Sequence, residues 1–183
     1  MRWGTSGLKN KDLIASLSEQ IENHNTVSFL TKEDEDDVTE VMARSFINDP
    51  LFNWMSNVDE AKPNQKELIL DLNRWIFKFT NGRALRRKKG VVIGAQADGS
   101  LAGAMTIVPY GPNTSDVDFF SVLLSIIKMG PPPVHKKGTK GQYGPMAVKR
   151  MDSLKILVKR RKEHMKKHSR WIFLSLVGVL HEH

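Results

Sequence analysis

The stretch that decides the fold is WIFLSLVGVL, residues 171–180. It is almost continuously apolar, it includes β-branched and aromatic side chains, and no proline interrupts it. A run of this length and composition predicts a strand that is buried on both faces of a sheet. It is too short to cross a bilayer as a helix, which takes about 20 apolar residues. Gly178, inside the run, indicates a β-bulge or the close approach of a ligand.

Length and composition indicate one globular domain. The chain has 183 residues, of which 40% are hydrophobic and 26% are charged, values that are ordinary for a water-exposed domain with its own core. It has no cysteine, which excludes disulfides, thiolate catalysis and cysteine-based zinc sites. The first 20 residues lack the apolar core of a secretory signal. We therefore expect a cytoplasmic protein, with a transit peptide as the alternative.

Charge is distributed unevenly along the chain. The formal net charge is +8, and the segment from Lys149 to Arg170 holds ten Lys and Arg residues against two acidic ones. A second basic cluster lies at residues 83–89, and an acidic run occupies residues 33–37. Such asymmetry suggests an anionic partner, which could be nucleic acid, a membrane surface or a phosphate-rich cofactor. Solvated helix faces account for most of these charges in the simpler interpretation.

Local patterns predict the order of elements. We expect an N-terminal extension over residues 1–25 and one domain over residues 26–183. A short alternating run at residues 26–30 predicts a strand. Thr31 with Asp34 forms a capping-box pattern at the start of a helix that ends near Pro50.

The middle of the chain contains a long helix and a hairpin. Apolar residues at helical spacing predict a helix over residues 64–80. Asp98-Gly99, between two β-prone runs at residues 90–97 and 101–108, predicts an antiparallel hairpin. An apolar helix is expected over residues 116–129, followed by a loop over residues 131–144 that is either a lid or a linker. A long amphipathic helix from Pro145 leads to the closing strand.

Two segments resemble the GNAT acetyltransferase superfamily. One is the basic helix that ends in histidine and continues into WIFLSLVGVL, over residues 164–180; the other is RSFINDPLFNWM, residues 44–55, with its Phe-x-x-Asp-Pro-x-aromatic pattern. The resemblance implies an α/β (α+β) fold with a mixed, mainly antiparallel sheet flanked by helices. The family's pyrophosphate loop, Gln/Arg-Gly-x-Gly-x-Gly/Ala, would begin just after His183, so we expect the C-terminal strands of the family to be missing from this chain.

The resemblance also implies an activity and a set of site residues. The activity is transfer of an acetyl group from acetyl-CoA, the co-substrate, to a primary amine of a small-molecule acceptor. Backbone groups of Val177, Gly178 and Val179 correspond to those that hold the pantetheine arm and polarise the thioester carbonyl. The register of the strand decides which of these residues face the core.

Aromatic residues and carboxylates supply the other candidates. The resemblance implies that Phe46, Phe52 and Trp54 line the acceptor pocket; the alternative is that they are core side chains. Asp49 and Glu182 are the candidate general bases, with a capping or surface role as the alternative. His164 and His168 have the spacing of zinc proteases, but Met165 replaces the required glutamate, so no metal site is expected.

Three functions remain open from the sequence. The first is the N-acetyltransferase, which we expect to bind acetyl-CoA poorly and to be inactive as the chain stands, because the pyrophosphate loop is not in it. The second is a non-catalytic remnant that folds with a partner. The third is a basic nucleic-acid-binding module built on the helix at residues 149–170, which is disfavoured because interleaved aromatic residues are lacking there. We expect no membrane partner, and the basic surface favours an anionic acceptor.

Overall fold

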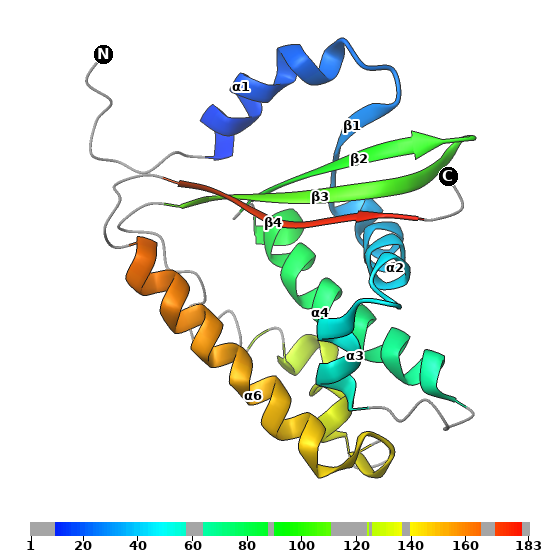
Figure 1. Cartoon of the computed structure of the whole chain (residues 1–183). Coiled ribbons are helices and arrows are strands. Elements are labelled where there is room, and N and C mark those ends of the chain that lie inside the picture. Colours follow the sequence, from blue (N-terminus) through cyan, green and yellow to red (C-terminus); the bar gives the residue numbers. More distant parts are fainter. Residues whose placement is uncertain are drawn as a thin grey trace.

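Helices cover both faces of an antiparallel four-stranded sheet in this computed structural model (Figure 1). The structure describes residues 10–57, 64–87, 90–110, 124, 126–136, 140–165 and 171–180. Helix α1 lies on one face, and α2 and α4 lie on the other. In chain order the elements are α1 (Asn10–Glu22), β1 (Val27–Leu30), η1 (Lys32–Asp34), α2 (Glu35–Ser45), α3 (Pro50–Ser56), α4 (Gln65–Arg87), β2 (Val91–Ala97), β3 (Ser100–Tyr110), η2 (Pro133–His135), α6 (Lys140–Met165) and β4 (Trp171–Val179). This arrangement confirms the predicted α+β fold.

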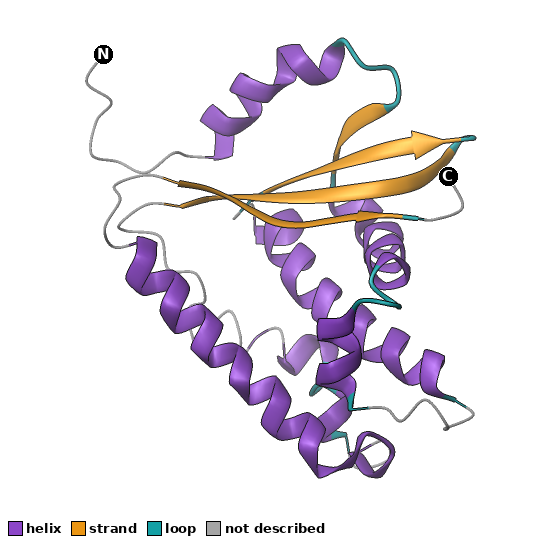
Figure 2. Cartoon of the chain, in the orientation of Figure 1, coloured by secondary structure: helices purple, strands orange, loops and turns teal. Residues whose placement is uncertain are grey.

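The sheet follows the order of the chain. Its strand order is β1-β2-β3-β4, and each neighbouring pair is antiparallel (Figure 2). The predicted hairpin is confirmed, since Ala97 pairs with Ser100 across Asp98 and Gly99. Both turn residues have positive φ angles, 51° and 77°. Asp-Gly favours this two-residue turn because both residues tolerate the left-handed conformation.

Strand β4 lies at one edge of the sheet. It pairs with β3 from Val179 opposite Gly103 to Trp171 opposite Tyr110, with a register shift between Thr106 and Ile107. The predicted strand is therefore confirmed, but its predicted burial on both faces is wrong at its C-terminal end, residues 177–180, where side chains are described. The side chains of Val177 and Val179 are 48% and 57% exposed, because no element in the described part of the chain covers them. An apolar run predicts a strand, but it does not reveal whether other elements cover both faces of that strand or only one.

Helix α2 begins at the predicted cap. The backbone N–H of Thr31 donates to Asp34 Oδ2 at 2.7 Å, and one 3₁₀ turn precedes the α-helix. Val38 and Met42 are fully buried, and the apolar stripe that they form faces both the sheet and α4.

Three ion pairs join α2 to α4. Their charged atoms approach within 2.9 Å or less, and they pair Glu35 with Arg86, Asp36 with Lys78 and Glu40 with Arg74. The Glu40–Arg74 pair is two-pronged, with a second N–H···O distance of 3.1 Å. The hydrogen bond from Arg74 is the main cause that lowers the pKa of Glu40, and it correspondingly raises the pKa of Arg74.

Helix α4 is longer than the sequence pattern predicted. It continues from residue 80 to Arg87 because its last turns are also buried against the sheet. Asn81 is fully buried there and accepts a hydrogen bond of 2.8 Å from the Thr106 hydroxyl on β3. Polar Asn81 interrupts the apolar periodicity, which explains why the pattern ended early.

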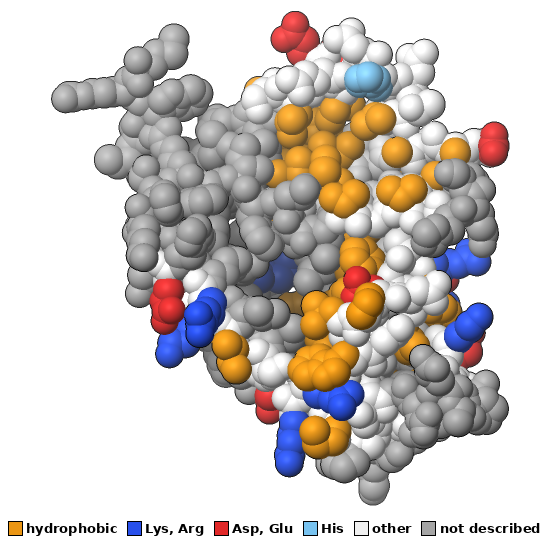
Figure 3. All heavy atoms as spheres, viewed as in Figure 1, with side chains coloured by type: hydrophobic (Ala, Val, Ile, Leu, Met, Phe, Trp, Pro, Cys, Tyr) orange, Lys and Arg blue, Asp and Glu red, His pale blue; other side chains and the backbone are white. Residues whose placement is uncertain are grey.

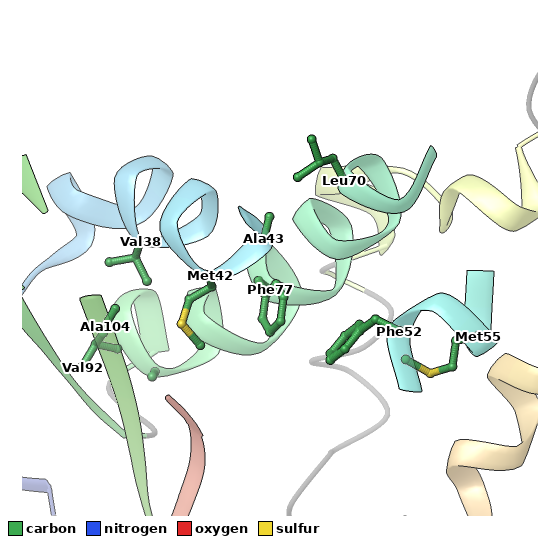
Figure 4. Close-up of a cluster of buried hydrophobic side chains, with 10 residues drawn as sticks. Val38, Met42, Ala43, Phe52, Met55, Leu70, Phe77, Val92 and Ala104 are labelled. Carbon is green, nitrogen blue, oxygen red and sulfur yellow. The ribbon is translucent and has the colours of Figure 1, made fainter. Parts of the chain in front are cut away.

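The main core lies between the sheet and helices α2, α3 and α4 (Figure 4). Three of its aromatic rings, Phe46, Phe52 and Phe77, have centroids 5.2–5.3 Å apart. Offset or tilted rings at this spacing add to the apolar burial. Phe77, which is fully buried, connects the helical layer to the short helix α3.

A second core joins α4, η2 and α6. Tyr143 is fully buried, and its hydroxyl donates to the Leu68 carbonyl at 2.6 Å. Gly144 follows with a φ of 71°, which interrupts helical geometry inside α6, and Asn57 donates to the Tyr143 carbonyl at 3.1 Å. The expected loop over residues 131–144 is thus shorter than predicted, because its described ends pack against α4 and α3.

The N-terminal helix α1 packs on the face of the sheet opposite α2 and α4. Leu17 and Ile21 contact the cluster formed by Val91, Ile93 and Ile107. Helix α1, within the segment expected to be an N-terminal extension, is therefore part of the layered fold. Most of the apolar helix expected at residues 116–129 lies outside the described residues, although 124 and 126–129 are helical. Within the described chain, no helix has the length and apolar character needed to cross a membrane.

Replacing Tyr143 with phenylalanine should destabilise the protein by about 1 kcal/mol, the usual net value of one buried hydrogen bond. The ring and its packing remain, so only the bond to the Leu68 carbonyl is lost. Burial raises the pKa of Tyr143, which keeps its proton available for this bond. Urea denaturation measures the change. Ser18→Ala, which removes an exposed hydroxyl bonded to the Ile14 carbonyl, is the control, and an equal loss in both variants would contradict the assignment.

Replacing Glu40 with glutamine should cost about 0.5 kcal/mol at neutral pH, because the pair with Arg74 is partly exposed and screened. A depressed folded-state pKa contributes stability that is fully present above the ordinary glutamate pKa of about 4.3 and is lost as the pH falls through the lowered folded-state pKa. The difference between wild type and variant should therefore be present at neutral pH and should disappear at an acidic pH at which the folded-state carboxyl is protonated.

Denaturation at both pH values tests this dependence. Glu67→Gln is the matched control, since that carboxylate is 72% exposed and lies 3.9 Å from the same guanidinium. A Glu40 difference that persists at low pH would refute the electrostatic origin.

Candidate active site at the end of strand β4

Gly178 allows the end of β4 to pack closely against α2. A Cβ atom added to Gly178 would lie 2.7 Å from Met42 Sδ and 3.1 Å from Ser45 Cβ. Glycine is therefore required by the approach of a helix, and not by the approach of a ligand at this atom. The register shift of β4 lies three residues earlier, opposite Thr106 and Ile107, so the predicted bulge at Gly178 is also wrong.

Backbone groups of Val177 and Val179 lie on the free edge of the strand. The N–H of Leu180 donates to the Ala102 carbonyl at 2.9 Å. Ladder bonds alternate along an antiparallel strand, so Gly178 also directs its N–H and C=O toward β3. The same alternation directs those of Val177 and Val179 away from it. Two donors and two acceptors are thus presented in a row along the outer edge.

An apolar hollow adjoins this edge on the face of the sheet that carries α1. Its volume is about 200 Å³, and Val177, Gly178 and Val179 line it together with residues of β1, β2 and β3. Hydrophobic side chains gather over the strands between α1 and β4 (Figure 3). Its floor contains small residues, Gly94, Ala95, Gly103 and Ala104. The three predicted cofactor-binding residues are therefore brought together at one surface.

The three predicted pocket residues do not share one surface. Phe46 and Phe52 pack together in the aromatic core with Phe77, and Phe52 is buried. Trp54 is 44% exposed, and the Arg150 guanidinium lies 5.2 Å from its ring centroid while donating to its carbonyl. None of the three lines the apolar hollow beside β4. The core alternative therefore fits Phe46 and Phe52, and it does not fit Trp54.

Asp49 is the N-cap of helix α3. Its Oδ1 accepts hydrogen bonds from the N–H groups of Leu51 and Phe52, at 2.8 and 3.2 Å. This is the capping role that the sequence offered as the alternative to a general base. Glu182, the other candidate base, lies outside the described residues. Among the described residues no group of three metal-ligating side chains occurs.

A larger hollow lies where β4 ends. No site was predicted there. Its volume is about 530 Å³, and it is formed by α2, the tip of the β2–β3 hairpin and Leu180. Asp34, Asp37 and Glu40 supply carboxylates, and Arg44 supplies a cation. Asp34 is engaged by Thr31, and Glu40 by Arg74, whereas Asp37 has no bonding partner among the described residues.

The acidic run at residues 33–37 contains a signal for this hollow, since it contributes Asp34 and Asp37 to the lining. Acidic residues are also favoured at the start of a helix, so the charge pattern alone does not separate a helix start from a site.

Replacing Gly178 with alanine should destabilise the protein by about 1–3 kcal/mol, because the new methyl group overpacks the contact with Met42 and Ser45. Thermal or urea unfolding measures the effect. Val179→Ala, on the opposite face of the same strand, should change stability by less than about 0.5 kcal/mol.

The double variant with Met42→Ala identifies the contact. Removing the Met42 side chain makes room for the methyl group, so the two substitutions together should cost less than the sum of their separate effects. Strict additivity would show that Gly178 is not constrained by α2.

Comparison with known proteins does not assign the chain to a family. No protein-family model matches the sequence, and no curated protein matches it. Its function is therefore inferred from the residues around β4.

Proposed function

We propose that this chain acts in N-acetyl transfer, which moves an acetyl group from acetyl-CoA to a primary amine. The observation that supports it best is the free edge of β4 at Val177 and Val179, with the apolar hollow beside it. An acyl-pantetheine arm is an extended chain with two amides separated by methylenes. Such a ligand can add to a strand edge in the way that an extended peptide does.

The edge offers what the transfer step requires. When the neutral amine attacks the thioester carbonyl, negative charge develops on the carbonyl oxygen. The amide C–N bond forms as the C–S bond breaks, and the departing CoA thiolate takes up the proton that the amine loses. A fixed backbone N–H aimed at that oxygen stabilises the transition state without reorganisation. The outward N–H groups of Val177 and Val179 are held by the ladder of the neighbouring residues, including the bond from Leu180, so they are positioned before a ligand arrives.

The acidic hollow at the end of β4 is the proposed place of the acceptor. Primary amines are cations at neutral pH, and carboxylates attract them. Asp37 is the carboxylate of this hollow that no described side chain engages, so we assign to it the binding of the ammonium group. It is also the candidate to take up a proton before attack, in place of Asp49, whose oxygen caps α3. A cationic acceptor thus replaces the anionic one favoured by net charge.

Proline substitutions on the free edge test the proposal. Proline is tolerated where a strand N–H faces outward, so Val177→Pro and Val179→Pro should remain folded while losing one donor each. Each variant is titrated with acetyl-CoA, and the backbone amide signals of β4 are followed by NMR, which detects weak binding. At least one variant should bind about fivefold more weakly, the value of one hydrogen bond.

Alanine variants at the same positions are the matched controls. They shorten the side chain and retain the N–H, so they should bind acetyl-CoA nearly as well as wild type. If acetyl-CoA at millimolar concentration leaves the β4 amides unperturbed, or if alanine and proline weaken binding equally, the proposed role of this edge is wrong.

A further inference from the structure

A basic hollow lies beside α4, apart from the residues of the β4 site. Its volume is about 510 Å³, within the range of small-molecule sites. One wall is α4, with Arg74, Lys78 and Arg86; the other contains Lys128 and Lys136. Asp71 is the carboxylate that lines it. None of these residues lines either hollow at β4.

Carboxylates orient the cations on α4. Arg74, Lys78 and Arg86 each pair with an acidic residue of α2 outside the hollow, and Arg74 also pairs at 3.3 Å with Asp71, which lines the hollow. Gly82 provides room for Arg86, since a Cβ atom there would lie 2.8 Å from the Arg86 Cζ. These pairs partly neutralise the α4 wall and hold its side chains in place, and Lys78 keeps ammonium donors beyond its single recorded bond to Asp36.

The opposite wall supplies the charge that is not neutralised. Lys128 and Lys136 are exposed, and neither has a carboxylate partner among the described residues. Desolvating an unpaired ammonium is costly, but an anion between two of them gains two attractive contacts. The excess positive charge of the hollow therefore comes from these two lysines.

Contacts with α4 hold the lysine wall in place. The indole N–H of Trp75, on α4, donates to the Gly130 carbonyl at 3.0 Å, and Val134 belongs to the buried cluster that includes Leu68 of the same helix. Pro133 and Val134 are buried between the lysines. The two walls are thus held at a fixed separation without a ligand, which lowers the entropy that binding would cost.

We propose that this hollow binds a small molecule bearing a phosphate or diphosphate group. Lysine ammonium groups and the remaining guanidinium donors suit phosphate oxygens, and the volume accommodates more than a single carboxylate. Either a nucleotide or a phosphorylated metabolite without a base supplies this chemistry. The site does not depend on the proposed acetyl transfer, because its residues and its ligand are defined without acetyl-CoA.

Calorimetric titration of the full chain with inorganic pyrophosphate tests the site. The variant Lys128→Gln with Lys136→Gln should bind about tenfold more weakly, about threefold for each exposed charge contact. Binding by wild type should also weaken as salt rises from about 0.05 to 0.3 M, because exposed charges are screened. The matched control is Lys66→Gln with Lys149→Gln, two exposed lysines that do not line the hollow, with the same change in net charge.

The outcomes separate a built site from diffuse attraction. Absence of pyrophosphate binding at low salt, or an equal loss in the control variant, would overturn the proposal. Selective loss in the Lys128 and Lys136 variant supports it. ADP distinguishes the two sources of phosphate: binding that is tighter than that of pyrophosphate indicates that the nucleoside is also contacted, and equal binding indicates recognition of the phosphates alone. The proline variants of β4 should bind pyrophosphate normally, so failure of one proposal leaves the other intact.

Discussion

Helix α2 packs on the sheet along one side and on α4 along another, and both functional surfaces depend on its position. Met42 is fully buried in the main core and faces Gly178 at the end of β4. Because glycine lacks a side chain, the strand approaches the helix closely and its ladder to β3 ends in a defined geometry. The ladder hydrogen bonds alternate along the strand. Because Gly178 directs its backbone groups toward β3, those of Val177 and Val179 point outward.

The charged side of α2 has a different role. The ion pairs advance along α2 while they go back along α4. Glu35, at the start of α2, pairs with Arg86 near the end of α4, and Glu40, further along α2, pairs with Arg74, which comes earlier in α4. Single exposed pairs contribute little to stability, but this series specifies how α2 and α4 are aligned. The same carboxylates orient the cations that line the basic hollow. The alignment of the two helices and the arrangement of the hollow are therefore one set of contacts.

The sequence predicted the elements better than it predicted their surroundings. The Asp98-Gly99 turn and the Thr31 cap depend on a few adjacent residues, and both were predicted correctly for that reason. The burial of β4 was not predicted correctly, because edge strands and central strands can have the same apolar composition. Helix α4 extended past its predicted end because buried Asn81 bonds to Thr106, a partner 25 residues away.

Candidate sites show the same division. Residues 177–179 are contiguous on one strand and lie at one surface, and their binding role stays a prediction. The family resemblance assigned the aromatic residues of the 44–55 segment to a pocket, yet Phe46 and Phe52 face the core. The basic hollow could not be anticipated, because Lys78, Lys128 and Lys136 are separated in sequence and meet only through the packing of Trp75 and Val134.

Gly144 has a mechanical consequence for the molecule. Its positive φ sets the direction in which α6 leaves the buried Tyr143 anchor, and Asn57 fixes the adjacent carbonyl. About 20 helical residues follow, an arm of about 30 Å. A change of about 10° at this joint would displace the far end, near Met165, by about 5 Å over that arm. A single glycine therefore sets the direction of the whole helical arm that extends beyond the buried Tyr143.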